Sequence, residues 1–289
     1  MKLGFLGYGE AARAFHEGLG RPGLDVVAFD RLLDHDDGGM RAAMAMRGAE
    51  PCDVASLGNV DWIFSAVTAD QSLVAVEPLL PHLREGQVLI DINSVSPARK
   101  RETAVGVEAR GCGYLDMAVM APVYPKKHAT PVLLAGPLAE KLLPELVSLG
   151  FSVSLAGAEV GAATAIKMVR SLFVKGLEAI TVETLLAAEA SGCLDGILAS
   201  LSKSFPGLGW PDFAVYQFER TLRHGGRRAA EMRESASTMA ALGLRSELAG
   251  EVAAVQARMG ACGVEEGLDL HQTVRRTLAL RLGGGGGED

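Results

Sequence analysis

Short apolar runs alternate with longer segments of helical spacing through the first half of the chain. The runs predict strands at residues 2–6, 25–29, 62–67, 87–92, 113–119, 132–134 and 152–155. Between them, the spacing predicts a helix that ends at Gly20 and further helices at residues 40–47, 71–83, 98–110 and 139–149. Because strands and helices alternate, we predict right-handed βαβ units and a doubly wound, mostly parallel sheet with both faces covered.

The pattern changes near residue 160, after which nearly every segment has helical spacing. Residues 160–190 contain no proline and a single glycine after Gly161, so they predict one long helix. A Gly/Pro-rich segment at residues 205–211 interrupts the helical pattern that otherwise continues to residue 282. The glycine-rich end, residues 283–289, predicts a disordered tail.

A glycine-rich turn joins the first strand to the first helix. It reads GYGEAA, the G-x-G-x-x-A form of the dinucleotide-binding fingerprint. Gly7 permits the tight turn, Gly9 lets a pyrophosphate approach the backbone, and Ala12 lets the helix lie close to the sheet. The phosphates are expected at the free N–H groups of the helix N-terminus. The predicted cofactor contacts here are Gly7, Tyr8, Gly9, Glu10 and Ala11.

Asp30 ends the second predicted strand and supplies the acidic residue that the fingerprint requires. A carboxylate at this position accepts hydrogen bonds from the adenosine ribose. Asp30 and the acidic loop after it would repel a 2′-phosphate, which favours NAD, whereas Arg31 keeps NADP open. Ligands bind at the carboxyl ends of such strands, so Val67 and Thr68 are predicted cofactor contacts as well. We therefore predict an α/β Rossmann domain over residues 1–157 and an all-α substrate and dimerisation domain over 158–282.

Composition and charge narrow the functional classes. Lys and Arg total 28 against 35 Asp and Glu, a net charge of −7, which argues against binding to nucleic acid or to anionic membranes. No apolar run approaches the ~20 residues of a membrane span, and because the first predicted strand begins at residue 2 we expect no signal peptide. The four cysteines are far apart, so neither a metal site nor a disulfide framework is indicated. We expect a cytoplasmic protein.

The helix predicted over residues 160–190 carries polar residues at spacings of three and four. Lys167, Arg170, Ser171, Lys175 and Glu178 share one face of a helix that is otherwise apolar, and such helices are usually buried. One interpretation is a solvated stripe with an ion pair between Lys175 and Glu178. The other is a polar stripe lining a cleft between the domains, where Lys167 binds a substrate anion or transfers a proton to its oxygen.

Three motifs, in order, resemble the β-hydroxyacid dehydrogenases, the family of 6-phosphogluconate and 3-hydroxyisobutyrate dehydrogenases. Residues 4–9, GFLGYG, are similar to the family's G-F-I-G-x-G, and residues 91–97, DINSVSP, to its D-x-S-T-x-x-P. Gly161 followed by Lys167 matches the pattern that supplies the family's catalytic lysine. The resemblance implies NAD(P), Asn93 and Ser94 beside the nicotinamide, and a homodimer or homotetramer formed through the helical domain.

Two segments depart from the family pattern. The family's substrate loop reads D-A-P-V-S-G-G, whereas residues 116–122 read DMAVMAP, so Met120 and Ala121 stand where a serine and a glycine would contact substrate. After the lysine, K-x-x-N-N becomes KMVRS, which makes Arg170 and Ser171 the expected substrate contacts. The chain is similar to a branch with K-x-x-R-S-x-x-x-K-G and a basic H-G-x-R-R segment.

The cations of this branch suggest a small anionic substrate, since arginine grips a carboxylate or phosphate with two hydrogen bonds. Lys175 is a further expected substrate contact. Arg227 and Arg228 have an alternative interpretation as a surface turn with ion pairs to Glu231. His128, placed after a strand, is either another substrate contact or part of a solvated loop.

Together these features predict an NAD(P)-dependent oxidoreductase. It would move hydride between nicotinamide and a small anionic hydroxy acid, with Lys167 as general acid or base. An imine reductase-like enzyme is one alternative, although such enzymes usually replace the lysine. A nucleotide-binding protein without turnover is the other, and the altered substrate loop favours it.

Overall fold

A computed structural model describes residues 1–20, 24–35, 38–263 and 267–283. The chain divides into two compact units between Met168 and Val169, within helix α6 (Ala162–Ala190). The domain boundary expected after residue 157 stays a prediction. Part of the acidic loop after Asp30 (residues 36–37) and nearly all of the expected tail (residues 284–289) lie outside the described residues.

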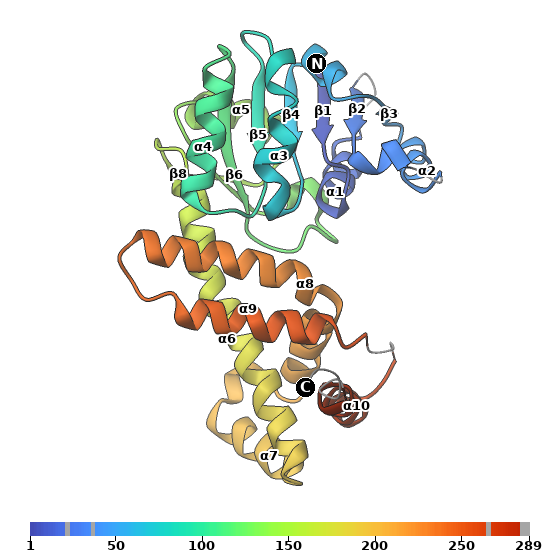
Figure 1. Ribbon diagram of the computed structural model, residues 1–289, viewed down its shortest axis with the longest axis vertical. Helices are drawn as coiled ribbons and strands as arrows, with labels where there is room; N and C mark the ends of the chain where they lie inside the picture. Colours follow the sequence, from blue (N-terminus) through green and yellow to red (C-terminus); the bar gives the residue numbers. More distant parts are fainter. Residues whose placement is uncertain (21–23, 36–37, 264–266, 284–289) are drawn as a thin grey trace, which may run out of the picture. The chain divides into compact units, whose positions relative to one another are not determined.

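The first unit is built around one eight-stranded sheet with the order β3-β2-β1-β4-β5-β6-β7-β8 (Figure 1). All neighbouring strands are parallel except β6 and β7. The first six strands follow the order 3-2-1-4-5-6 of a doubly wound dinucleotide-binding sheet, which confirms the predicted fold. The strands are β1 (Lys2–Leu6), β2 (Asp25–Phe29), β3 (Glu50–Pro51), β4 (Trp62–Ser65), β5 (Val88–Asp91), β6 (Gly113–Val119), β7 (Val132–Ala135) and β8 (Val153–Gly157).

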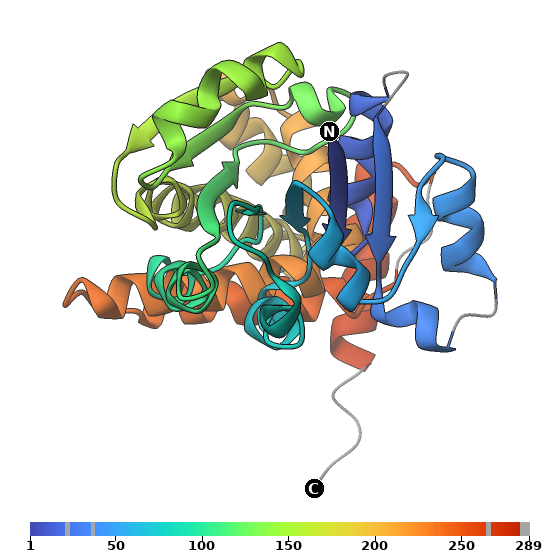
Figure 2. The ribbon, with the colours of Figure 1, turned by 90° about the horizontal axis from the view of Figure 1, so that it is seen from above.

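Helices cover both faces of this sheet (Figure 2). Successive strand residues point to opposite faces, so that on β1 Phe5 joins one buried cluster and Leu6 the other. The cluster around Phe5 receives α1 (Glu10–Leu19), α2 (Gly39–Ala45) and α5 (Ala139–Ser148). The cluster around Leu6 receives α4 (Pro97–Glu108) and α3 (Ser72–Val76).

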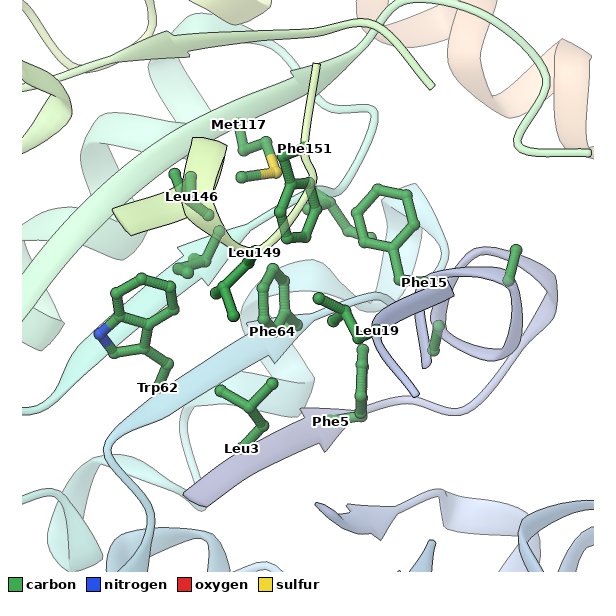
Figure 3. Packing of buried hydrophobic residues seen from close by; sticks show 14 of the residues in the cluster. Leu3, Phe5, Phe15, Leu19, Trp62, Phe64, Met117, Leu146, Leu149 and Phe151 are labelled. Atoms are coloured by element: carbon green, nitrogen blue, oxygen red, sulfur yellow. The ribbon is translucent and has the colours of Figure 1, made fainter. Parts of the chain in front are cut away.

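Four phenylalanines from separate elements meet in the larger cluster (Figure 3). Phe5 and Phe64 stack with ring centroids 5.4 Å apart, and Phe15 of α1 meets Phe151 edge to face at 5.5 Å. Each such pair contributes about 0.5–1.5 kcal/mol beyond the area it buries. The rings fix α1 against the sheet and thereby hold the glycine-rich turn that precedes it.

Two short elements differ from the sequence-based expectation. Residues 71–83 were expected as one helix, but α3 ends at Val76 and is followed by a 3-10 turn, Leu80–His82. Pro78 and Pro81 lack the N–H groups that a continuous helix needs. Strand β3 was not predicted, because a strand of two residues is too short to show the alternation of apolar and polar side chains.

The second unit contains the rest of α6 with α7 (Leu194–Ser204), α8 (Asp212–Ala241), α9 (Glu247–Gly260) and α10 (Leu270–Gly283). No strand occurs beyond residue 168 in the described part of the chain, which fits the all-α prediction. Helices α8 and α9 touch at Gly225, where a Cβ would lie 2.5 Å from the backbone nitrogen of Gly260. Within the described ranges, no helix combines the length and apolarity that a membrane span requires.

Candidate active site

The turn between β1 and α1 has the backbone that its glycines predict. Gly7 has a φ of 87°, and a Cβ there would lie 2.7 Å from the carbonyl oxygen of Ala66, so no other residue fits. Around Gly9, by contrast, no atom lies within 4 Å of a Cβ position. The N-terminus of α1 therefore has open space beside it, which suits a pyrophosphate bound by backbone N–H groups.

A cavity of about 510 Å³ lies beside this turn. The strands whose ends surround it include β1 and β4, between which the strand order reverses, and this switch point is where doubly wound sheets bind ligands. The residues of the cavity wall that were predicted to bind a cofactor are Gly7, Gly9, Asp30, Arg31, Val67 and Thr68. The two predicted contacts on α1, Glu10 and Ala11, do not line the cavity. Glu10 is exposed, and Ala11 packs against the buried cluster around Phe5.

The Asp30 carboxylate is held in place by two backbone groups. Oδ2 accepts a hydrogen bond from the N–H of Tyr8 at 2.8 Å, and Oδ1 accepts one from the N–H of Leu32 at 3.0 Å. A carboxylate has about four acceptor sites, so each oxygen can still accept a ribose hydroxyl. Arg31 is exposed, and its Nη1 donates to Gln71 at 3.4 Å.

Tyr8 contributes its backbone rather than its ring to this turn. The side chain is fully buried, and its hydroxyl is hydrogen-bonded to His16 Nδ1 at 2.6 Å. Burial raises the pKa of Tyr8 to about 12 and lowers the pKa of His16, so both rings are neutral at neutral pH. The motif position alone gave no sign that this ring faces the core.

Asn93 joins the loops that follow β4 and β5. Its Oδ1 accepts a hydrogen bond from the N–H of Val67 at 2.7 Å, and its Nδ2 donates to Ser65 Oγ at 2.8 Å. The residue is buried, and its own N–H donates to Asp91 Oδ1. Asn93 therefore shapes the edge of the sheet where the nicotinamide is expected.

Lys167 lies at this edge of the sheet. Its Nζ donates a hydrogen bond to Ser94 Oγ at 2.6 Å, and both side chains are half-buried. Ser94 follows β5, and the glycine that precedes the lysine, Gly161, has a φ of 97° that other residues rarely adopt. The two residues that the resemblance placed near the reacting centre are thus in direct contact.

A buried ionic cluster lies where the end of β5 pairs with the middle of β6. The Lys100 side chain is fully buried, with Nζ 2.9 Å from Asp91 Oδ1 and 3.4 Å from Asp116 Oδ1. The Tyr114 hydroxyl donates to Asp91 Oδ2 at 2.6 Å, and burial, followed by the charge of Asp91, raises the pKa of Tyr114 well above its usual value. The tyrosine therefore remains a donor, and the two carboxylates share one lysine.

Asp116 connects this cluster to helix α6. Its Oδ2 accepts hydrogen bonds from the N–H groups of Gly161 and Thr164, each at 3.1 Å, and its Oδ1 accepts one from Thr164 Oγ1 at 2.8 Å. A carboxylate at a helix N-terminus is stabilised by the free N–H groups and the helix dipole. The cluster thereby positions the helix turn that carries Lys167. Sequence reasoning took Asp116 only as the start of a substrate loop and missed Lys100.

The remaining predicted contacts of the first unit lie after β6. Met120 is half-buried and donates its N–H to the carbonyl of Pro131 at 2.9 Å, and Ala121 is exposed. His128 packs edge to face on Phe151, with ring centroids 5.4 Å apart, and lies close to Gly18 of α1. A packing role accounts for His128 as placed, and its role as a substrate contact stays a prediction.

The polar residues of α6 in the second unit are buried, so the solvated-stripe interpretation is wrong for Ser171, Lys175 and Glu178. Lys175 Nζ lies 2.8 Å from Glu231 Oε2 of α8 and donates to Ser171 Oγ at 3.1 Å. The expected pair between Lys175 and Glu178 is replaced by pairs to α8, because both side chains point toward that helix. Arg170 is exposed.

Arg228 is also buried and belongs to α8 rather than to a surface turn. It forms an ion pair with Glu178, whose Oε2 accepts from Arg228 Nε at 2.9 Å and from Gln256 Nε2 at 2.8 Å. The two glycines beside it suggested a turn, but Gly225 instead permits the close contact with α9. This network joins α6, α8 and α9. Arg227 is exposed.

Among the residues that the structure describes, no group of three or more histidine, cysteine, aspartate or glutamate side chains is placed to hold a metal ion.

Replacing Gly9 with glutamate should abolish dinucleotide binding without loss of stability. The new side chain would occupy the open space above the turn and place a negative charge where phosphates bind, while its Cβ clashes with nothing. Nucleotide fluorescence titration and thermal unfolding measure the two effects. Gly250→Glu, at an exposed glycine of α9 with equally open surroundings, is the matched control and should bind like the parent. If Gly9→Glu binds the dinucleotide as the parent does, the turn is not part of the binding site.

The amino-acid sequence matches two protein families. Residues 2–146 match the NAD binding domain of 6-phosphogluconate dehydrogenase. Residues 188–259 match a domain of unknown function, DUF1932.

Two curated relatives match over part of the chain. An uncharacterized 28.5 kDa protein of Methanothermus fervidus is 27% identical over 61% of this chain and 66% of that protein. A 2-(hydroxymethyl)glutarate dehydrogenase of Eubacterium barkeri is 26% identical over 60% of this chain and 58% of that protein. The chain thus spans less than two thirds of each of these relatives' own lengths.

Several solved structures are similar over nearly the whole chain. A conserved hypothetical protein from Sinorhizobium meliloti 1021 is 34% identical, with a TM-score of 0.73, over 97% of this chain and 96% of that one. For 3-hydroxyisobutyrate dehydrogenase of Mycobacterium tuberculosis the identity is 17% and the TM-score 0.72, over 95% and 98% of the two chains. For an imine reductase from Myxococcus stipitatus they are 22% and 0.55, over 95% and 99%.

The last two likenesses establish a common fold. The match over residues 2–146 extends over half of the chain and includes the glycine-rich turn and the Asn93–Ser94 loop. This protein belongs to the family defined by the NAD binding domain of 6-phosphogluconate dehydrogenase.

Proposed function

We propose that this protein is an NAD(P)-dependent dehydrogenase that transfers hydride between nicotinamide and the carbinol carbon of a small anionic hydroxy acid. Lys167 is the general acid or base. The contact between Lys167 Nζ and Ser94 Oγ carries the proposal, because it holds a proton-transfer group at the edge of the sheet where we expect the nicotinamide.

The residues present fit a dinucleotide. The bare backbone at Gly7 and Gly9 accepts the pyrophosphate, and the Asp30 carboxylate has acceptor sites left for ribose hydroxyls. When bound, the cofactor supplies the hydride donor or acceptor.

The protein's own residues transfer the proton to and from the substrate oxygen. In the oxidation direction, neutral Lys167 takes the proton from the substrate hydroxyl as the carbonyl forms, and in the reduction direction the ammonium returns it. Ser94 holds Nζ in one position, and the cluster of Lys100, Asp91 and Asp116 fixes the backbone on both sides of that contact.

An anionic substrate is supported by the charges along α6. Arg170 lies three residues after Lys167, hence on the same side of the helix, and it is exposed. Lys175 already neutralises Glu231, so Arg170 is the better candidate for gripping a carboxylate. The relative from Eubacterium barkeri is named for a dehydrogenase of a hydroxymethyl dicarboxylic acid, which agrees with this substrate class.

Imine reduction is the second candidate, and the loop after β6 favours it. Met120 replaces a serine hydroxyl and Pro122 replaces a glycine N–H, so this surface has fewer hydrogen-bond donors for a carboxylate and suits a less polar substrate. Assays of purified protein with NAD(P)H against hydroxy acids, their oxo products and cyclic imines separate the candidates. Turnover of hydroxy acids alone supports the proposal, turnover of imines alone replaces it, and turnover of neither indicates a binding protein.

We expect NADH to bind at least about tenfold more tightly than NADPH, a difference of ~1.4 kcal/mol. The Asp30 carboxylate is fixed by Tyr8 and Leu32 and would lie against a 2′-phosphate. Asp30→Ser should therefore reduce the preference, whereas Asp25→Ser, at the exposed start of β2, should leave it unchanged. Competition titrations with both nucleotides measure the ratio. If the parent binds NADPH more tightly than NADH, the expectation is wrong, and Arg31 rather than Asp30 determines the cofactor preference.

A further inference from the structure

Three buried polar side chains of the second unit form a chain of contacts that has one direction. Glu231 Oε2 of α8 lies 2.8 Å from Lys175 Nζ, and Lys175 Nζ donates a hydrogen bond to Ser171 Oγ at 3.1 Å. Ser171 and Lys175 are 6% and 4% exposed. An ammonium group has three donors and no acceptor, so the Ser171 oxygen is the acceptor of this bond. The Ser171 proton therefore remains available for another acceptor.

The Ser171 hydroxyl differs from other hydroxyls of the same unit. A serine or threonine within a helix can donate to the carbonyl four residues earlier. In the second unit this bond is formed, at 2.7–2.9 Å, by Thr181, Ser202, Thr221 and Thr238. Across the described part of the chain, Ser171 donates neither to the Lys167 carbonyl nor to any other acceptor. A buried donor without an acceptor is unfavourable, so it indicates an acceptor that a ligand supplies.

The direction of this chain of contacts limits what a substrate can present to Ser171. Ser171 follows Lys167 by one turn on the continuous helix α6 and lies on the same side of it. A substrate that exchanges a proton with Lys167 therefore lies on the side of the helix that carries the Ser171 donor. The atom that meets this hydroxyl has to accept a hydrogen bond without bringing a proton of its own. A carboxylate oxygen does so, whereas a protonated imine nitrogen would set two donors face to face.

We propose that Lys175 and Glu231 are positioning residues that commit the Ser171 hydroxyl to donate, so that the site selects an acceptor-only oxygen over a nitrogen donor. Glu231 holds the Lys175 ammonium, and the ammonium occupies the Ser171 oxygen as an acceptor. Lys175 thus acts through Ser171 rather than by the direct substrate contact that the sequence led us to expect. The inference rests on the proposed function, because that function places the substrate beside Lys167.

Calorimetric titration with malonate tests the Ser171 donor without depending on turnover. The oxygens of malonate only accept hydrogen bonds at neutral pH, and we expect the parent to bind it in the millimolar range. Ser171→Ala should weaken this binding by roughly tenfold or more, because a hydrogen bond to a charged group is lost. Lys175→Met should weaken it less, since the hydroxyl stays but can turn to the Lys167 carbonyl. Ser202→Ala, at a serine of α7 that donates to Leu198, is the matched control and should bind like the parent.

A double-mutant cycle separates positioning from a merely structural role. If Lys175 acts only through Ser171, Lys175→Met should not change malonate affinity further in the Ser171→Ala background. Additive effects of the two substitutions, parent-like binding by Ser171→Ala, or a parent that does not bind malonate would overturn the inference. If Lys175→Met alone does not fold, its combination with Glu231→Leu removes both members of the buried pair and takes its place in the cycle. Malonate binding that follows the cycle, without turnover of any hydroxy acid, would support the inference and contradict the proposed dehydrogenase activity.

Discussion

Replacing Lys167 with methionine is expected to lower kcat by roughly 10²- to 10⁴-fold while leaving dinucleotide binding intact. Methionine keeps much of the aliphatic stem but cannot exchange a proton with the substrate oxygen, and the hydrogen bond to Ser94 is lost. Steady-state kinetics with the best hydroxy acid and a nucleotide titration measure the two quantities.

Two further variants sharpen this test of the lysine. Lys141→Met removes an exposed lysine of α5 and should behave like the parent. Ser94→Ala keeps the amine but removes its hydrogen bond to Ser94 Oγ, so kcat should fall less than in Lys167→Met. A Lys167→Met variant that turns over like the parent would contradict the lysine mechanism, even if the protein proved to be a dehydrogenase.

Replacing Lys100 with methionine is expected to destabilise the protein by about 3–5 kcal/mol. Two aspartates, Asp91 and Asp116, would remain buried with no cation between them, and removal of one partner from a buried ionic cluster leaves charge uncompensated. Urea unfolding of parent and variant measures the difference in unfolding free energy.

The control for this variant is Lys203→Met, an exposed lysine of α7, which should stay within about 0.5 kcal/mol of the parent. Because Asp116 also caps α6, any folded Lys100→Met protein should show a lower kcat at full cofactor saturation. Unfolding of the variant at the parent's urea midpoint would mean that the cluster contributes little to stability.

The Rossmann fold and its cofactor edge could be predicted because their signals are local. Strand and helix periods are visible within a few residues. The glycine motif itself predicts a turn that only glycine adopts at Gly7 and an open backbone at Gly9. The same locality explains the failures. Pro78 and Pro81 divide a segment whose apolar spacing looked continuous, and two-residue β3 is too short to show a period.

The parts of the site that could not be predicted depend on contacts between distant residues. Spacing shows that Ser171, Lys175 and Glu178 share a face of α6, but not that α8 and α9 supply Glu231, Arg228 and Gln256 to that face. The burial of Lys100 is likewise decided by two aspartates on neighbouring strands. From the sequence pattern alone, a charged residue is interpreted as exposed to solvent or as a ligand contact, because the ion-pair partner that lets it be buried lies far away in the sequence.

The most direct test of the proposed function is a fluorescence titration of the intact protein with NADH and with NADPH, alongside Gly9→Glu. We expect saturable binding that favours NADH, no binding by the variant, and a change in the titration when a hydroxy acid that forms the ternary complex is added. If neither nucleotide binds the parent, the assignment of the cavity beside Gly7, Gly9 and Asp30 is wrong, and the proposed dehydrogenase activity is wrong with it.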